Sequence, residues 1–371
     1  MSAGVSAGVS ASPWQAARNI LCVRLDSLGD VLMCTPAMRA IRQSRPGCRL
    51  TLLTSHSGAA AVPFIAELDD VIAYPAPWMK SSTPHGSPAD ALMIALLAAR
   101  DFDAAVIFTS FSQSALPAAL MCQLAGIPIR LAHCRENPYQ LLTDWVAEPE
   151  PDKLVRHEVR RQLDLVASVG WSADCSRLSF KVPGSDLLFM RRRLVEHSIG
   201  PRQPFILMHP GASAPSRRYP PELWAEVIRG LGRRRAWPIV MTGEAGESAT
   251  VDAIRTASGQ KVHSLAGQLS LGQLGAAIAL AAVVVSNNTG PAHMAAAIGT
   301  PLVDLYALTN PQHTPWQVNS RLLFHDVPCR FCYKSVCPQG HHDCLTKVTP
   351  KQVIDAVCSL TGQVRVHEAR I

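Results

Sequence analysis

Short apolar runs alternate with helix-forming segments in two separate series, and this alternation limits the fold more than any other feature. Apolar runs of this length that lead into polar, glycine-containing loops are typical of buried parallel strands. The predicted strands are residues 20–23, 50–54 and 104–108 in the first series, and 205–208, 238–241, 283–285 and 302–305 in the second. The predicted helices are residues 31–43, 90–100 and 114–124, and then 221–234, 247–257, 271–282 and 292–298. The pattern predicts an α/β protein with two Rossmann-like domains, which would bind ligands between the carboxyl ends of their strands.

The composition is that of a folded chain that does not repeatedly cross a membrane. Of its 371 residues, 48% are hydrophobic and 17% are charged. The longest clean apolar stretch, residues 274–285, is well short of the ~20 residues that a membrane helix needs. The formal net charge of +7 suits anionic small molecules or a membrane surface better than nucleic acid. Residues 1–17 lack a secretory-signal pattern and are predicted to form a disordered leader.

The chain has eleven cysteines, and most of them are scattered singly among apolar neighbours, as expected for reduced core residues of a cytoplasmic protein. The four that lie close together are Cys329, Cys332, Cys337 and Cys344, with His341 and His342 between the last two. Four thiolates at short spacing suit structural zinc or iron, although these spacings are shorter than those of standard zinc ribbons. The alternatives are a pair of disulfides, disfavoured in a cytosolic chain, or reduced structural cysteines.

The first segment that carries chemistry is R-L-D-S-L-G-D, residues 24–30, directly between the first strand and its helix. A carboxylate at this turn, such as that of Asp30, is well placed to act as a general base. The plainer interpretation is that Asp30 caps the helix and Asp26 makes a turn. The segment does not match G-x-G-x-x-G, and the chain has no Walker A motif, so a dinucleotide site of the oxidoreductase type is not predicted.

Two further loops follow buried strands in the second series and precede helices. Residues 209–220 combine a glycine, hydroxyl groups and arginines, which suits a diphosphate, or they form a solvated surface loop. Residues 286–293 offer the hydroxyl of Thr289 and backbone N–H groups to phosphate oxygens. His293 follows, and its alternative role is that of a buried core histidine. The loop 242–247 supplies acidic groups for ribose hydroxyls or for a helix N-terminus.

The strings VRLDSLGDVLMCTPAMRAIR, LMHPGASAPSRRYPPELWAEV and VVVSNNTGPAHMAAAIGTPLVDLY resemble, in this order, the signature regions of glycosyltransferase family 9. This family comprises the bacterial ADP-heptose:lipopolysaccharide heptosyltransferases and their relatives. The resemblance extends over residues 19–357. It implies a GT-B fold, in which an N-terminal domain binds the acceptor and a C-terminal domain binds the nucleotide sugar. It also implies an inverting transfer that needs no metal at the reacting centre.

The resemblance also implies a role for each motif residue. Asp30 matches the family's proposed catalytic base. Ser213 and Arg217 fall where the family contacts the donor diphosphate, and Glu247 matches the acidic residue that binds the nucleoside. The residues that match the donor motif D-T-G-x-x-H are Asn288, Thr289, Gly290 and His293. The first position therefore carries an amide in place of the family's carboxylate.

In the mechanism that follows, Asp30 takes the proton of an acceptor hydroxyl as that hydroxyl attacks the anomeric carbon. Arg217, the Thr289–Gly290 backbone and His293 stabilise the charge on the departing nucleoside diphosphate. No cofactor is required for this chemistry. The predicted partners are an ADP-sugar donor and a lipid-linked or oligosaccharide acceptor, with possible arginine contacts to the inner membrane and no nucleic acid.

The predicted organisation is a leader over residues 1–17, an acceptor-binding domain over 18–190, a nucleotide-sugar domain with the cysteine cluster over 191–348, and a helix and tail over 349–371. Two alternatives to heptose transfer stay open. One is a family 9 transferase with another donor or a non-lipopolysaccharide acceptor, and the other is a non-catalytic homologue that binds a sugar nucleotide. The asparagine at position 288 leaves the second open, whereas the carboxylate of Asp30 argues against it.

Overall fold

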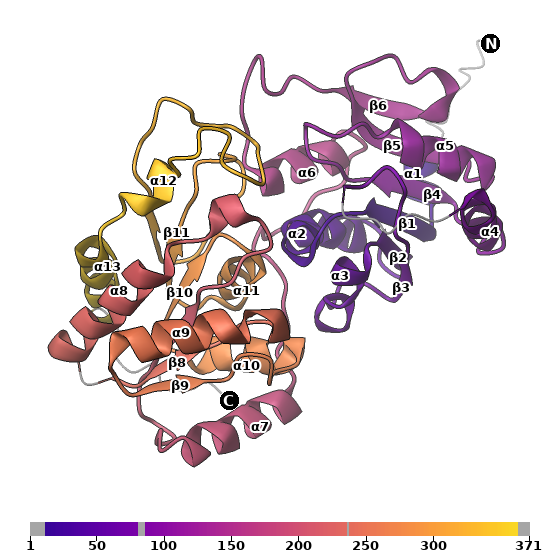
Figure 1. Cartoon of the computed structure of the whole chain (residues 1–371). Coiled ribbons are helices and arrows are strands. Elements are labelled where there is room, and N and C mark those ends of the chain that lie inside the picture. The colour runs from indigo at the N-terminus through magenta and orange to yellow at the C-terminus, as the bar shows by residue number, and fades with distance from the viewer. Residues whose placement is uncertain (1–11, 81–85, 236, 363–371) are drawn as a thin grey trace, which may run out of the picture.

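The structure is a computed structural model that describes residues 12–80, 86–235 and 237–362, and the chain forms two parallel sheets of six strands each. Figure 1 shows the two sheets as separate halves of the molecule, with helices on both faces of each. The predicted α/β class is confirmed. Helices on both faces explain why the strands are apolar throughout rather than alternating, because both faces of each sheet are buried.

The first sheet has the strand order β3-β2-β1-β4-β5-β6, and all neighbouring strands are parallel. Its strands are β1 (Asn19–Arg24), β2 (Arg49–Thr54), β3 (Asp70–Ala73), β4 (Ala104–Ile107), β5 (Ile129–Cys134) and β6 (Asp144–Ala147). The helices of this half are α1 (Pro13–Ala16), α2 (Leu28–Ser44), α3 (His56–Ala59), α4 (Ser87–Ala98), α5 (Leu116–Leu124) and α6 (Glu158–Ala167), with 3₁₀ turns η1 (Val62–Phe64) and η2 (Tyr139–Leu141).

The second sheet repeats this architecture with the order β12-β11-β10-β7-β8-β9. Its strands are β7 (Ile206–His209), β8 (Ile239–Met241), β9 (Val262–Ser264), β10 (Val283–Asn287), β11 (Leu302–Leu305) and β12 (Ser320–Leu323). The remaining helices are α7 (Gly184–Glu196), α8 (Pro221–Arg234), α9 (Ser248–Ser258), α10 (Leu271–Leu280), α11 (Gly290–Ile298), α12 (Asp343–Thr346) and α13 (Pro350–Gly362), with 3₁₀ turns η3 (Pro215–Arg217) and η4 (Ala245–Glu247).

The strand orders place the predicted motifs where ligands bind to open parallel sheets. In the first sheet the chain steps outward from β1 through β2 to β3, and then restarts on the other side at β4. The second sheet reverses in the same way between β7 and β10. A crevice forms at such a switch point, outside the carboxyl ends of the two central strands. The loops that follow β1, β7 and β10 are the three segments that the sequence singles out.

Two predicted boundaries need correction. Residues 13–16 form α1, so the end of the predicted leader is ordered, because Trp14 is 2% exposed and its ring meets that of Trp171 edge-on. The rest of the leader, residues 1–11, lies outside the described residues. The predicted boundary at residues 190/191 falls inside α7, a continuous helix that packs on α10 of the second half. The helix predicted near the C-terminus is present as α13, which packs on α8.

The two halves contact each other through α2 and α11, whose N-terminal turns meet. A Cβ atom placed on Gly29 would lie 2.6 Å from Cδ2 of His293, so only glycine allows this approach. A second contact is the segment 310–317, which belongs to the second half and runs along the start of α6. There the N–H of Glu158 donates to the carbonyl of Gln312 at 3.0 Å, and His157 bonds the carbonyl of Thr314 at 2.8 Å.

Candidate active site

Arg24, the last residue of β1, holds three carboxylates at the centre of the first half. It is completely buried, and its guanidinium lies 2.6 Å from Glu158, 2.8 Å from Asp26 and 3.4 Å from Asp30. A buried guanidinium is stable only where nearby acids and hydrogen bonds compensate it. Arg24 therefore fixes the two aspartates of the loop after β1 relative to each other.

Asp30 caps α2, as the plainer interpretation of the sequence expects, and its carboxylate also faces this guanidinium. Its Oδ2 atom accepts hydrogen bonds from the N–H of Ser27 at 3.1 Å and from the Ser27 hydroxyl at 2.6 Å. Burial raises the pKa of Asp30, but the charge of Arg24, then that of His313, and the Ser27 hydroxyl lower it, so that the pKa falls to about 2. Asp30 is thus ionised at neutral pH, as a general base must be.

A cavity of about 280 Å³ opens beside Asp26. Gln113 donates to Oδ1 of Asp26 at 2.6 Å. Burial raises the pKa of Asp26 to about 6, because the opposing charge of Arg24 is countered by that of Asp30. The polar residues that line the cavity are Asp26, Thr109, Ser112, Gln113 and Ser114, and its aromatic residues are Trp78 and Phe108. Hydroxyl, amide and carboxylate groups beside aromatic faces suit a polyhydroxylated ligand.

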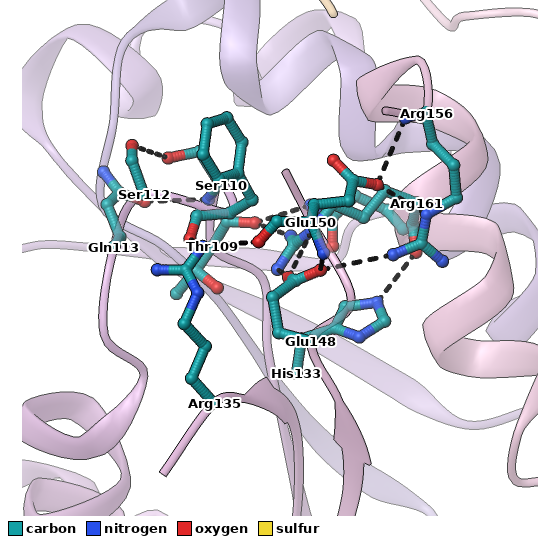
Figure 2. Close-up of polar contacts among 12 residues, drawn as sticks. Thr109, Ser110, Ser112, Gln113, His133, Arg135, Glu148, Glu150, Arg156 and Arg161 are labelled. Atoms are coloured by element: carbon teal, nitrogen blue, oxygen red, sulfur yellow. Dashed lines mark hydrogen bonds and ion pairs between the residues drawn. The ribbon is translucent and has the colours of Figure 1, made fainter. Parts of the chain in front are cut away.

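Arg161 of α6 and Arg135, the residue that follows β5, hold the loop of residues 108–115, which forms one wall of this cavity. Arg161 pairs with Glu148 and donates to the backbone carbonyl of Thr109 (Figure 2). Arg135 donates to the carbonyl of Phe111, and its guanidinium lies 5.6 Å from the centre of that ring. Because the buried Arg161 and the exposed Arg135 both donate to its backbone, the loop presents its hydroxyl and amide side chains in fixed positions.

The loops after β7 and β10 form the opposite side of the site, and Asn287 joins them. Its Nδ2 atom donates to the carbonyl of Pro210 at 2.7 Å, and its Oδ1 accepts the N–H of Tyr219 at 3.1 Å. Arg217, half-buried at the end of η3, forms no ion pair with any of the described acidic residues. Ser213 is exposed on the same loop. The loop therefore offers an uncompensated cation, as an anion site requires.

Thr289 and Gly290 lie at the N-terminus of α11, next to this loop. Thr289 is the N-cap residue, and its hydroxyl is weakly bonded to the carbonyl of Asn287 at 3.4 Å. Asn288 is 5% exposed, and its Oδ1 has no hydrogen-bond partner among the described residues. Free N–H groups at a helix start bind phosphate oxygens. The Oδ1 atom of Asn288 is therefore free to accept a hydrogen bond from a ligand.

His293 and Glu247 also reach this region. His293 is 6% exposed, and burial lowers its pKa to about 3, so that the ring is neutral. Glu247 closes a capping box at η4, where its carboxylate accepts the N–H of Glu244 at 2.9 Å. The same carboxylate lies against Gly211, because a Cβ atom there would overlap it. The structure thus brings all the predicted donor residues to the carboxyl ends of β7, β8 and β10.

The four clustered cysteines do not form a metal centre in this structure. All four are free and half-buried, and no group of three or more His, Cys, Asp or Glu residues in the described part of the chain is placed to hold a metal ion. The Cys329 Sγ atom lies 3.9 Å from Nε2 of His341. His342 bonds the carbonyl of Ser216 instead. The zinc or iron site stays a prediction, and no step of the chemistry is derived from it.

His313 is a residue of this site that the sequence analysis missed. It is 9% exposed, and its Nε2 has no hydrogen-bond partner among the described residues. Burial lowers the pKa of His313, whereas Asp30 and Glu158 raise it and Arg24 and Arg217 lower it. It therefore lies within electrostatic reach of both Asp30 and Arg217. No local motif marks it, because the segment 310–317 becomes part of the site only when it docks on α6.

The contact between Gly29 and His293 yields a first prediction. Changing Gly29→Ala adds a methyl group where no space exists, and overpacking of this kind costs about 1–3 kcal/mol. We expect a lower melting temperature and lower activity. Gly184→Ala is the matched control, since Gly184 also lies in the first turn of a helix and has no neighbour within 4 Å of an added Cβ. An unchanged melting temperature for Gly29→Ala would show that α2 and α11 do not meet closely in solution.

No helix in the described parts of the chain is both long and apolar enough to cross a bilayer.

Comparison with known proteins agrees with this arrangement. Residues 93–342 match the family model of glycosyltransferase family 9 (heptosyltransferase). The chain is 29% identical to lipopolysaccharide heptosyltransferase 2 of Salmonella typhimurium over 174 residues, 45% of this chain and only half of that protein. It is 28% identical to the Escherichia coli K12 protein of the same name over 261 residues, 66% of this chain and 72% of that protein.

The fold is also shared with solved structures. A glycosyltransferase family 9 protein from Veillonella parvula DSM 2008 matches with a TM-score of 0.79 at 19% identity, over 94% of this chain and 98% of that one. The two facing α/β halves are those of the GT-B fold. Because the family model covers more than half of its length, the chain belongs to glycosyltransferase family 9.

Proposed function

We propose that this protein transfers a heptose, or a related sugar, from an ADP-sugar donor to a lipopolysaccharide core or related glycan, with inversion at the anomeric carbon. The observation that carries the proposal is the approach of Gly29 to His293, because it unites two motifs from different sheets. The carboxylate next to Gly29 is thereby held opposite the loops that suit a diphosphate. Family membership supports sugar transfer, and the lipopolysaccharide heptosyltransferases among the relatives support heptose.

In the proposed reaction the acceptor glycan lies in the cavity beside Asp26, and one of its hydroxyls faces Asp30. Asp30 takes the hydroxyl proton while the oxygen forms a bond to the anomeric carbon of the donor. The bond from that carbon to the phosphate oxygen breaks on the opposite face. The departing nucleoside diphosphate takes up the bonding electrons as negative charge. A base on one face and a leaving group on the other produce inversion.

Arg217, the N-terminus of α11 and the neutral ring of His293 are proposed to bind that departing charge. Such donors act strongly in a site that excludes water, since they are already oriented when charge develops. We propose that this arrangement needs no metal at the reacting centre and no cofactor. Ser213 would contact the diphosphate, and Glu247 would bind the nucleoside.

We further propose that the protein works in the cytoplasm on a lipid-linked or oligosaccharide acceptor. A peripheral contact with the inner membrane would use the arginines at 191–193 and 233–235, of which Arg193 and Arg235 are half-buried and the other four are exposed. One arginine in each group is already paired, Arg193 with Glu196 at 2.8 Å and Arg234 with Asp355 at 2.6 Å. The membrane contact would therefore depend on the remaining arginines.

The direct experiment is a transfer assay with ADP-heptose and a truncated lipopolysaccharide core acceptor. We expect stoichiometric release of ADP and a product heavier by one heptose, with activity retained in excess EDTA. Turnover of only other sugar nucleotides would favour the different-donor alternative, and Asn288 is the residue that would then account for it. ADP binding without any transfer to glycan acceptors would favour the non-catalytic homologue.

A prediction for the donor side concerns Arg217. Hydrogen bonds to charged groups contribute about 1.5–3 kcal/mol, so Arg217→Ala should weaken ADP binding by roughly 10- to 150-fold. Arg217→Lys should recover part of the loss, because lysine keeps the charge without the bidentate fork. Arg229→Ala on α8 removes the same charge away from the site and should leave ADP affinity unchanged. Calorimetry measures the ADP affinity of each variant. Wild-type affinity in Arg217→Ala would show that this arginine does not bind the donor.

A further inference from the structure

The cysteine-rich segment of residues 327–344 lies on η3, the turn that carries Arg217. The contact is centred on Ser216, which is 3% exposed. The N–H of Ser216 donates to the carbonyl of Ser335 at 3.0 Å, and its hydroxyl donates to the carbonyl of Lys334 at 2.7 Å. The carbonyl of Ser216 accepts a hydrogen bond from Nε2 of His342 at 2.6 Å. All three polar groups of Ser216 are thus bonded to this one segment.

This contact matters because η3 has little structure of its own. It spans only three residues, and the N–H of Arg217 bonds back to the carbonyl of Ala214 at 2.9 Å within the turn. A single 3₁₀ turn does not hold its own position, since its internal hydrogen bonds are few and poorly aligned. The position of Arg217 in the loop after β7 therefore depends on how firmly its neighbour Ser216 is held.

The segment is itself anchored on both sides of the site. Val327, Cys329 and Cys344 of the segment pack with Tyr306 and Leu308, which follow the end of β11. The N–H of Tyr333 donates to the carbonyl of Thr309 at 2.8 Å. These contacts fix the segment to the second sheet.

On the other side the segment contacts the first half of the molecule. The ring of Tyr333 meets that of Phe111 edge-on, with 5.3 Å between centroids. The Lys80 ammonium donates to the Ser335 hydroxyl at 2.7 Å. Phe111 belongs to the loop of residues 108–115 that walls the cavity. The segment thus bridges the cavity beside Asp26 and the loop after β7 that carries Arg217.

We propose that residues 327–344 act as a strap that positions Arg217 for the donor diphosphate, with Ser216 and His342 as the positioning residues. Neither residue touches the substrate in this proposal. Each acts on the nucleotide through the backbone of η3. The inference rests on the proposed function, because it requires that Arg217 bind the diphosphate.

The test measures ADP affinity by calorimetry in Ser216→Ala and His342→Ala, alongside donor KM, acceptor KM and kcat. Each variant should weaken ADP binding at least fivefold and raise the KM of the donor, while the KM of the acceptor stays within twofold. His341→Ala is the matched control, because His341 accepts the N–H of Asp343 at 2.9 Å and does not contact Ser216. Ser216→Thr keeps the hydroxyl and should restore affinity.

A double-mutant cycle separates positioning of Arg217 from general loss of structure. In the Arg217→Ala background, neither Ser216→Ala nor His342→Ala should weaken ADP binding further, because the group that they position is gone. The proposal would be overturned if the variants lost as much ADP affinity in the Arg217→Ala background as in the wild-type background. It would also be overturned if both single variants bound ADP with wild-type affinity. ADP binding by the unmodified protein without sugar transfer would instead overturn the proposed function alone, and no ADP binding at all would overturn both.

Discussion

Replacing Asp30 with asparagine should lower kcat by about 10²- to 10⁴-fold, the usual contribution of a general base. The amide keeps the size of the side chain but has no capacity to take a proton from the acceptor hydroxyl. ADP affinity should stay within about twofold, because the nucleotide is proposed to bind to the loops after β7 and β10. Single-turnover transfer assays and ADP calorimetry on the same preparation measure the two effects.

Asp26→Asn is the matched control for this prediction, since Arg24 holds both carboxylates. Asp26 has the higher pKa, about 6, and lines the cavity proposed to hold the acceptor, so its replacement should act mainly on the KM of the acceptor. If Asp26→Asn abolished turnover and Asp30→Asn did not, the base would be Asp26. Melting temperatures are needed for both, because Asp30 also caps α2.

Arg24→Met should cost about 3–5 kcal/mol of unfolding free energy, the range measured when one partner of a buried ion pair is removed. Methionine fills most of the arginine volume, but it leaves Glu158, Asp26 and Asp30 without their shared cation. Urea unfolding at pH 7 measures the loss, and Glu158→Gln should cost less because Arg24 keeps two carboxylates. A cost below about 1 kcal/mol would show that solvent or other groups compensate these acids.

The same variant has a predictable pH dependence. Without Arg24 the buried carboxylates have higher pKa values in the folded protein than in the unfolded chain. The folded state of the variant then binds protons more readily than its unfolded state. The loss of unfolding free energy relative to wild type should therefore shrink as the pH falls from 7 towards 5. A loss of unfolding free energy that grew on acidification would contradict this account of the carboxylates around Arg24.

The sequence predicted the central strands well and the outer ones poorly. Strands such as β1 and β10 are buried on both faces, so their apolar runs stand out in the sequence. The sequence analysis missed β5, because Arg130 and His133 interrupt its apolar run even though both are buried. The four edge strands, β3, β6, β9 and β12, were also missed, since they are short and mostly only partly buried.

For the site, the local motifs were informative and the long-range contacts were not. Asp30, Thr289 and Gly290 each lie in a strand–loop–helix unit, whose chemistry can be interpreted within a few residues. The binding of Glu158 to Arg24 is different, because 134 residues separate the partners. His313 and Ser216 likewise acquire their surroundings only from segments that fold onto them, so no spacing in the sequence reveals them.

The most direct test of the central claim is a crystal structure of the protein with ADP-2-deoxy-2-fluoro-heptose. The account predicts that the Arg217 guanidinium and the N–H groups at the start of α11 contact the diphosphate, with the Asp30 carboxylate facing the anomeric carbon from the opposite side. A diphosphate bound away from Arg217 and Thr289, or an anomeric carbon turned away from Asp30, would contradict it.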